Sequence, residues 1–183
     1  NLGCFRVEYI KTNHSIQDAA ALAIYTPVGT VLHTGDFKID YTPVFGDPID
    51  LQRFAELGKK GVLALMADST NAIRPGFTMS ERTVGKTFDA IFAEHKNNRI
   101  IVATFASNVD RVQQIVNTAH KYGRKVVVEG RSMVTVMEIA RELDYINVPE
   151  GTLIDIEQLR NYPPESTVLI STGSQGESMA ALS

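Results

Sequence analysis

The pattern of hydrophobic and polar residues along this chain of 183 residues changes near residue 72. Before that point, short hydrophobic runs stand between turn residues, a pattern typical of strands, and one segment has the spacing of an amphipathic helix. The expected strands cover residues 5–10, 20–26, 29–34 and 62–67, and the expected helix covers 50–59. The last of these strands is hydrophobic throughout, so we expect both of its faces to be buried.

After residue 72, strand-like runs alternate with amphipathic segments of about 10–15 residues, which indicates an α/β fold. The expected helices cover 80–95, 108–121, 132–143 and 155–161, with another after 176, and the expected strands cover 99–105, 125–128 and 167–170. This alternation predicts a mostly parallel sheet flanked by helices. We therefore expect two domains, residues 1–71 and 72–183.

Composition narrows the class of protein. Hydrophobic residues make up 44% and charged residues 21% of the chain, which is typical of a globular protein. The net charge of −3 argues against holding nucleic acid by bulk attraction to phosphate. The lone Cys4 excludes an internal disulfide and indicates a reducing, cytoplasmic location, and no hydrophobic run approaches the roughly 20 residues of a membrane span.

His14 and Asp36 each follow a strand-like run. An imidazole and a carboxylate at strand ends can bind the same zinc or manganese ion. A catalytic zinc has about three protein ligands, so the pair would form only part of a metal site. Each residue alone could instead be structural, with His14 bonding the backbone of a turn and Asp36 forming an Asx-turn.

Asp68 follows the hydrophobic run 62–67, at the end of a strand where open α/β sheets bind ligands. It could equally be a loop or helix-capping residue. His33 and Asp40 are weaker candidates. His95 and His120 lie near the ends of expected helices, where an imidazole interacts favourably with the helix dipole, and we expect both to be structural.

Three junctions between a strand and a helix could bind phosphate through the free N–H groups of the helix N-terminus. They are residues 105–108, 130–132 and 172–176, and the second adds the guanidinium of Arg131. Each is also a good helix cap, so each is weak evidence alone. The candidate phosphate-contacting residues are Phe105, Ser107, Asn108, Arg131, Gly173, Ser174 and Gln175.

Taken together, these segments resemble a known family. NHSIQD at 13–18 and HTGDF at 33–37 resemble the third and fourth metal-binding motifs of metallo-β-lactamase-fold hydrolases. MADSTNA at 66–72 resembles the acidic motif that opens the β-CASP insertion of nucleic-acid-processing members. PGFTMSE at 75–81, TFASN at 104–108 with RVQQ at 111–114, and STGSQGE at 171–177 are similar to segments of bacterial ribonuclease J. The resemblance follows the whole chain in order.

The resemblance implies a metal-dependent ribonuclease that acts from the 5′ end and internally, in rRNA processing and mRNA decay. Residues 1–71 would be the C-terminal part of a metallo-β-lactamase-like domain, and 72–183 a β-CASP domain. His14 would ligate one metal, usually zinc, and Asp36 would bridge two, while Asp68 would assist proton transfer or position the site. The hydroxyl-bearing junctions after Phe105 and around Ser174 would line the pocket for the RNA and its 5′ phosphate.

The family's main metal motif, His-x-His-x-Asp-His, and its late histidine motifs do not occur in the chain. The chain starts at Asn1 without a methionine, and Ser178 stands where members commonly have proline. We therefore expect a fragment that is inactive alone and does not retain zinc. The resemblance also implies RNA, further copies of the chain and other RNA-decay proteins as partners. The alternatives are another β-CASP nucleic-acid hydrolase and a non-catalytic RNA-binding α/β module.

Overall fold

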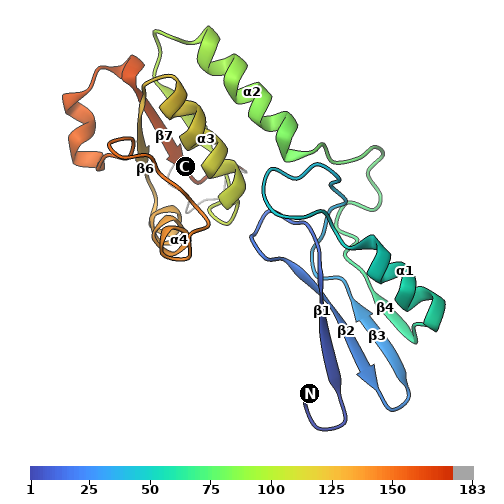
Figure 1. Cartoon of the computed structure of the whole chain (residues 1–183). Coiled ribbons are helices and arrows are strands. Elements are labelled where there is room, and N and C mark those ends of the chain that lie inside the picture. The colour runs from blue at the N-terminus through green and yellow to red at the C-terminus, as the bar shows by residue number, and fades with distance from the viewer. Residues whose placement is uncertain (175–183) are drawn as a thin grey trace. The chain divides into compact units, whose positions relative to one another are not determined.

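The computed structural model describes residues 1–174 and divides the chain into two compact units, Asn1–Ser80 and Glu81–Ser183. Each unit has its own sheet, and within residues 1–174 the first unit has one α-helix and the second has three (Figure 1). The expected domain boundary after residue 71 falls inside the first unit, nine residues before its end at Ser80.

The first unit contains a four-stranded sheet. Its strands are β1 (Arg6–Lys11), β2 (Ala20–Thr26), β3 (Gly29–His33) and β4 (Ala64–Met66), in that spatial order. The first three strands are antiparallel, and β4 lies parallel to β3. The tight turn between β2 and β3 is held by Thr26, whose hydroxyl donates to the Gly29 carbonyl over 2.8 Å.

Helix α1 (Leu51–Lys60) packs on one face of this sheet. Asp50 starts it, because its side chain accepts a hydrogen bond from the Arg53 amide, and Lys59 and Lys60 suit the negative end of the helix dipole. Leu57 is the buried residue of the helix. It belongs to a small core of five buried residues: Ile10, Ala21, Ala23, Leu32 and Leu57.

The prediction that the strand at 62–67 is buried on both faces is wrong. Leu65 is 61% exposed and Met66 is 55% exposed. The reason is the position of β4 at the edge of the sheet, where β3 is its one partner strand within residues 1–174. Hydrophobic sequence identified the strand but not its place in the sheet.

The second unit contains a three-stranded sheet in which every pair is parallel, which confirms the α/β prediction. Its strands, in the order β5-β7-β6, are β5 (Ile100–Ala103), β7 (Thr167–Ser171) and β6 (Lys125–Val128). The helices are α2 (Glu81–Glu94), α3 (Val109–Lys121) and α4 (Arg131–Glu142), with 3-10 turns η1 (Ile156–Asn161) and η2 (Pro164–Ser166).

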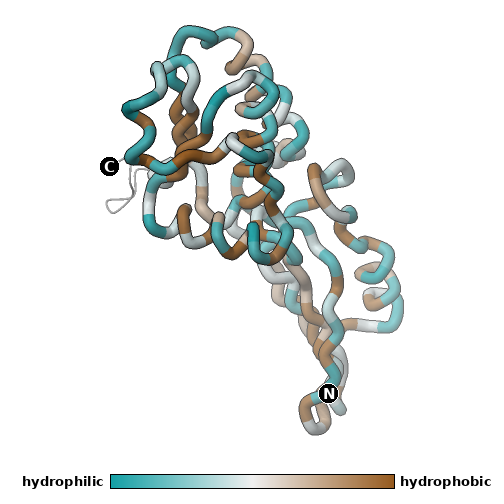
Figure 2. Tube along the Cα trace, turned by 60° about the vertical axis from the view of Figure 1, so that its left-hand side comes forward, coloured by the Kyte–Doolittle hydropathy of each residue, from teal (hydrophilic) through white to brown (hydrophobic). Residues whose placement is uncertain are grey.

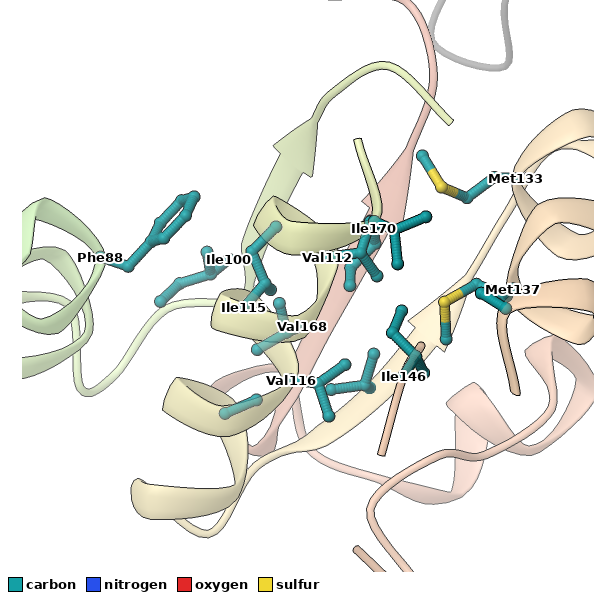
Figure 3. Close-up of a cluster of buried hydrophobic side chains, with 14 of the residues drawn as sticks. Phe88, Ile100, Val112, Ile115, Val116, Met133, Met137, Ile146, Val168 and Ile170 are labelled. Atoms are coloured by element: carbon teal, nitrogen blue, oxygen red, sulfur yellow. The ribbon is translucent and has the colours of Figure 1, made fainter. Parts of the chain in front are cut away.

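Alternate residues of the three strands form the floor of the second unit's core, including Ile100, Val126 and Val168. Ile115 of α3 and Met133 of α4 are fully buried in the same cluster (Figure 3). Hydrophilic and hydrophobic residues alternate along the helices, as expected when one face of each helix is buried (Figure 2). No helix in residues 1–174 is long and apolar enough to cross a membrane.

Candidate metal and phosphate sites

The structure brings His14 and Asp36 together, although 21 residues separate them in the chain. Asn13 forms an antiparallel bridge with Lys38, whose amide donates to the Asn13 carbonyl over 2.7 Å. This bridge aligns the segment after β1 with the segment after β3. As a result, His14 Nε2 lies 3.8 Å from Asp36 Oδ2.

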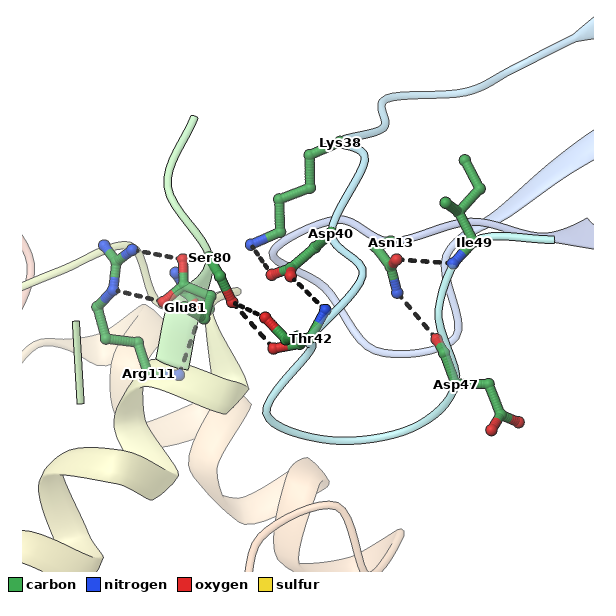
Figure 4. A network of polar contacts seen from close by, with 10 residues as sticks. Asn13, Lys38, Asp40, Thr42, Asp47, Ile49, Ser80, Glu81 and Arg111 are labelled. Atoms are coloured by element: carbon green, nitrogen blue, oxygen red, sulfur yellow. Dashed lines mark hydrogen bonds and ion pairs between the residues drawn. The ribbon is translucent and has the colours of Figure 1, made fainter. Parts of the chain in front are cut away.

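Asn13 fixes the backbone next to His14. Its side-chain nitrogen donates to the Asp47 carbonyl over 3.0 Å, and its side-chain oxygen accepts from the Ile49 amide over 2.8 Å (Figure 4). Asn13 is itself buried. Sequence reasoning placed it inside the motif at 13–18 but gave it no role. Its partners lie more than 30 residues away, so no local signal revealed this clamp.

A sharp turn presents Asp36. Gly35 has φ of 61°, a conformation that favours glycine, and an added Cβ would lie 3.3 Å from the Ala20 carbonyl. His33 Nδ1 accepts a hydrogen bond from the Gly35 amide over 3.0 Å. His33 therefore shapes the turn that exposes the Asp36 carboxylate.

Asp68 is held next to this pair. Its amide donates to the Thr34 hydroxyl over 3.0 Å, which ties the end of β4 to the end of β3. Its Oδ1 accepts from the Thr70 hydroxyl over 2.7 Å and from the Thr70 amide over 2.9 Å. The Thr70 hydroxyl is the main cause that lowers the pKa of Asp68, with smaller contributions from the amides of Thr70 and Phe37 and from His14. The carboxylate is therefore ionised at neutral pH.

These residues supply one imidazole and two carboxylates, a donor set that suits zinc or manganese. Within residues 1–174, however, no group of three or more His, Cys, Asp or Glu side chains is arranged to hold a metal ion. The chemistry of the donors fits a metal, and the described residues provide only part of a ligand set.

An open pocket of about 330 Å³ lies beside Asp68. It is lined from two loops of the first unit by Phe37, Lys38, Ile39, Asp68, Ser69, Thr70, Asn71, Ala72, Phe77 and Thr78. Its lining mixes hydroxyl, amide and carboxylate groups with aromatic side chains. This lining suits a ligand with one apolar face and polar edges.

In the second unit, the three predicted junctions follow the carboxyl ends of neighbouring parallel strands. The Thr104 amide donates to the Ser171 carbonyl and the Glu129 amide to the Ile170 carbonyl, each over 2.9 Å. These bonds continue the ladders that place the ends of β5, β7 and β6 side by side. Ligands of open α/β sheets bind at this edge.

The candidate side chains at this edge differ in how far they are exposed to solvent. Asn108 is buried, and its side chain accepts from the Arg111 amide over 3.2 Å to cap α3. Ser107 and Arg131 are exposed, and Phe105 is 44% exposed. Asn108 therefore shapes the helix N-terminus, whereas the others are accessible to a ligand.

The third junction contains Gly173, which has φ of 109°, and the exposed Ser174. Gln175 lies outside the described residues. The positive φ is available to glycine because it lacks a Cβ, so the chain can turn sharply after β7.

Two hydroxyl groups at the same edge were not predicted from the sequence as candidate site groups. The side-chain oxygens of Thr104 and Ser171 are buried and have no hydrogen-bond partner among the described residues. A buried hydroxyl without a partner is costly, so both are candidates for contact with a bound polar group. Each opens one of the motifs noted above, TFASN and STGSQGE, which was the available signal.

An ion pair supports the start of α3. Arg111 Nη2 lies 2.7 Å and Arg111 Nε 3.3 Å from the two oxygens of Glu81 (Figure 4). Glu81 is 8% exposed, and it begins α2. Two parallel charge-assisted bonds therefore fix the first turn of α3, next to Ser107 and Asn108.

Comparison with known proteins identifies relatives of this chain. Residues 97–183 match the family model described as "Ribonuclease J, beta-CASP domain". The chain is 48% identical to ribonuclease J of Helicobacter pylori (strain J99) over all of its length and 26% of that protein. It is 49% identical to ribonuclease J of Synechocystis over 97% of the chain, and 51% identical to ribonuclease J 1 of Streptococcus pyogenes over 96%. It spans 28% and 31% of those two proteins.

The fold also resembles a crystal structure of a protein of unknown function from Enterococcus faecalis V583. The TM-score is 0.64 at 19% identity, and the match covers 93% of this chain and 42% of that one. This likeness concerns the fold alone, whereas the sequence matches extend over nearly the whole chain. The chain is thus related to ribonuclease J over nearly its whole length, and residues 97–183 match the β-CASP domain of that family.

Proposed function

We propose that the protein is a metal-dependent ribonuclease that degrades or matures RNA from the 5′ end and also cuts internally. The observation that supports the proposal is the approach of His14 to Asp36, with Asp68 interacting electrostatically with His14, in a chain about half identical to ribonuclease J. Since the chain spans about a quarter to a third of its relatives, the proposal concerns the full-length protein.

His14 and Asp36 would hold zinc, with Asp36 bridging two ions and the remaining ligands coming from outside the described residues. When bound, the metal would lower the pKa of a water molecule and neutralise charge on the phosphate. The turn at Gly35 exposes the Asp36 carboxylate for this role, and the Asn13 clamp fixes the approach of His14.

Asp68 would position the site and accept a proton. Its hydrogen bonds from Thr70 hold the carboxylate in one orientation and favour its charged form. The bond from its amide to Thr34 keeps it at the end of β3, next to the turn that carries Asp36. These contacts support a fixed anion rather than a mobile surface residue.

The carboxyl edge of the second sheet would bind the RNA and its 5′ phosphate. Exposed Ser107, Arg131 and Ser174 offer hydroxyl and guanidinium groups there, and the start of α3 offers backbone N–H groups. The unpartnered hydroxyls of Thr104 and Ser171 support the presence of a polar ligand at this edge.

The family and the lone Cys4 also support a cytoplasmic protein whose partners include RNA, further copies of itself and other RNA-decay proteins. These partners are part of the proposal for the full-length protein.

The test is cleavage of a 5′-monophosphorylated single-stranded RNA by the full-length protein. We expect Asp36→Ala to lower the rate by more than about a thousandfold, because a catalytic metal contributes several kcal/mol to the transition state. Asp47→Ala is the matched control, since its carboxylate is exposed and points away from Asn13 (Figure 4). Undiminished cleavage by Asp36→Ala would contradict the proposal.

Metal content tests whether the metal ligands are divided between residues 1–183 and the rest of the full-length protein. We expect elemental analysis to find about two ions per chain in the full-length protein, as in two-metal hydrolases, and none held tightly by residues 1–183 alone. We expect residues 1–183 alone to be inactive as well. Two tightly bound ions on residues 1–183 would show that the ligands have been assigned wrongly.

A further inference from the structure

The segment at 75–81 was singled out in the sequence, but the proposed metal and phosphate sites give it no role. Its aromatic residue, Phe77, lines the pocket of about 330 Å³ that also contains Asp68. The other lining residues that matter here are Phe37, Ser69, Thr70 and Asn71. An aromatic side chain therefore stands within the same pocket as a candidate catalytic carboxylate.

Phe77 is 87% exposed, and it belongs to neither buried core cluster. A phenylalanine contributes most to folding when it is buried, so this one contributes little to the stability of its unit. Single exposed apolar residues are common, and exposure alone carries no conclusion. What separates Phe77 from the others is its place in a pocket lined by polar groups beside Asp68.

The loop that carries Phe77 is anchored at both ends within the first unit. At its start, Thr70 bonds to Asp68, and the Ala72 amide donates to the Ser69 carbonyl over 3.0 Å. At its end, the Ser80 hydroxyl donates to the Thr42 carbonyl over 2.9 Å. The ring is thus presented from a loop with fixed ends, which reduces the entropy lost when a ligand binds.

A nucleobase matches this combination of groups. It has a flat apolar face for the ring of Phe77, and its edges carry donors and acceptors that suit Ser69, Thr70 and Asn71. Stacking on an aromatic side chain is the usual way in which proteins hold single-stranded nucleic acid without a strong sequence preference. An apolar peptide would leave the polar walls of the pocket without partners.

We propose that Phe77 is a stacking platform for one base of single-stranded RNA, close to the phosphodiester that is cut. The inference rests on the proposed ribonuclease function and adds a residue that selects the substrate. A base in a duplex is already stacked on both sides, so the platform favours single-stranded RNA. Because every base has such a face, the contact tolerates any sequence.

The experiment uses the full-length protein and a series of 5′-monophosphorylated single-stranded RNAs, each with one abasic nucleotide at a different position. Cleavage kinetics are measured for wild type, Phe77→Ala and Phe77→Trp. For Phe77→Ala we expect KM to rise about tenfold with kcat nearly unchanged, within the range that base–aromatic stacking supplies. Phe77→Trp should keep the wild-type KM.

The abasic series identifies stacking specifically. One abasic position should raise the KM of wild type, and Phe77→Ala should be insensitive to that same position, since the contact is already lost. Ile73→Ala is the matched control, because Ile73 is 95% exposed on the same loop but does not line the pocket. Phe77→Ala and Ile73→Ala should both have the same unfolding free energy as wild type.

Three results overturn the inference. The first is that Phe77→Ala cleaves RNA with the wild-type KM. The second is that Ile73→Ala raises KM as much as Phe77→Ala does. The third is that wild type and Phe77→Ala respond equally to every abasic position. In each of these cases wild type still cleaves RNA and Asp36→Ala does not, so the proposed function survives. If wild type neither binds nor cleaves RNA, the proposed function and the inference fail together.

Discussion

The two units differ in how they are held together. Among the described residues, the second unit gathers fifteen buried hydrophobic residues from its sheet and from helices α2, α3 and α4 into one cluster, whereas the cluster of the first unit has five. The first unit also exposes most of the hydrophobic side chains of β4, and it contains an apolar pocket of about 440 Å³ between its sheet and α1. Hydrophobic burial therefore dominates in the second unit and is limited in the first.

The first unit compensates with polar contacts between distant segments. Arg53 of α1 forms a bidentate pair with Glu8 of β1, at 2.6 Å and 3.0 Å, and Tyr25 of β2 donates to the same carboxylate over 2.6 Å. Asn13 bridges the end of β1 to the loop before α1. The unit that carries the candidate metal ligands thus depends on directional contacts, which fix positions more closely than apolar packing does.

The largest expected effect on stability tests the core of the second unit. Phe92 is fully buried, its ring lies 5.8 Å from that of Tyr122, and the Arg124 guanidinium lies 5.4 Å from its centre. We expect Phe92→Ala to lower the free energy of unfolding by about 3–5 kcal/mol. Leu57→Ala in the first unit should cost about 2 kcal/mol, because its core neighbours Phe54 and Val62 also line the open pocket and can relax into the space. Denaturant unfolding measures both, and equal losses would remove the contrast between the two cores.

A smaller loss of stability is expected when the side-chain hydrogen bonds of Asn13 in the first unit are removed. Asn13→Ala leaves the Ile49 amide and the Asp47 carbonyl without their partner, which should cost about 1–3 kcal/mol. Asn97→Ala, an exposed residue of the second unit, should change stability by less than about 0.5 kcal/mol. Thermal unfolding of the two variants checks this. Equal stability of both variants would show that the clamp is not needed for folding.

The smallest effect is a dependence of stability on pH. The hydrogen bonds from Arg53 and then from Tyr25 lower the pKa of Glu8 from 4.5 to about 2. A lowered pKa means that the contribution of Glu8 to stability is complete above about pH 4.5 and is lost as the pH falls towards 2. Between these pH values, the stability of Glu8→Gln should therefore decrease less than that of wild type. The remainder of its acid unfolding should be the same as in wild type.

Acid titrations of stability, followed by circular dichroism, measure this difference. Glu56→Gln is the control, because Glu56 also bonds to Arg53 but its side chain is 44% exposed. Its titration should stay close to that of wild type, since exposed pairs contribute little. A Glu8→Gln curve identical to wild type would show that the pair has no role in the stability of the sheet.

Much of the fold could be predicted because its signals are local. The expected strand at 125–128 matches β6, and the cap at Asn108 starts α3 as expected. The expected metal and phosphate residues lie at strand ends because polar residues after a hydrophobic run mark that position. His14, Asp36 and Asp68 were recognised for this reason, although their roles stay predictions.

Other features could not be predicted, because they depend on residues far apart in the chain. The exposure of Leu65 follows from the place of β4 at the sheet edge, which its own sequence does not encode. The roles of Asn13 and Glu81 depend on partners 30 or more residues away. That the exposed Phe77 lines the same pocket as Asp68 also depends on the tertiary fold and could not be predicted from the local sequence.

The sequence by itself determined the elements, the parallel sheet, the family and the residues that could carry chemistry, because periodicity, caps and motifs are written in neighbouring positions. The tertiary structure decided which of these residues meet. Only folding sets the 3.8 Å between His14 and Asp36, the carboxyl edge shared by three junctions, and the pocket that Phe77 shares with Asp68. The physical reason is that these distances arise from long-range strand pairing, whose register depends on the packing of the whole unit.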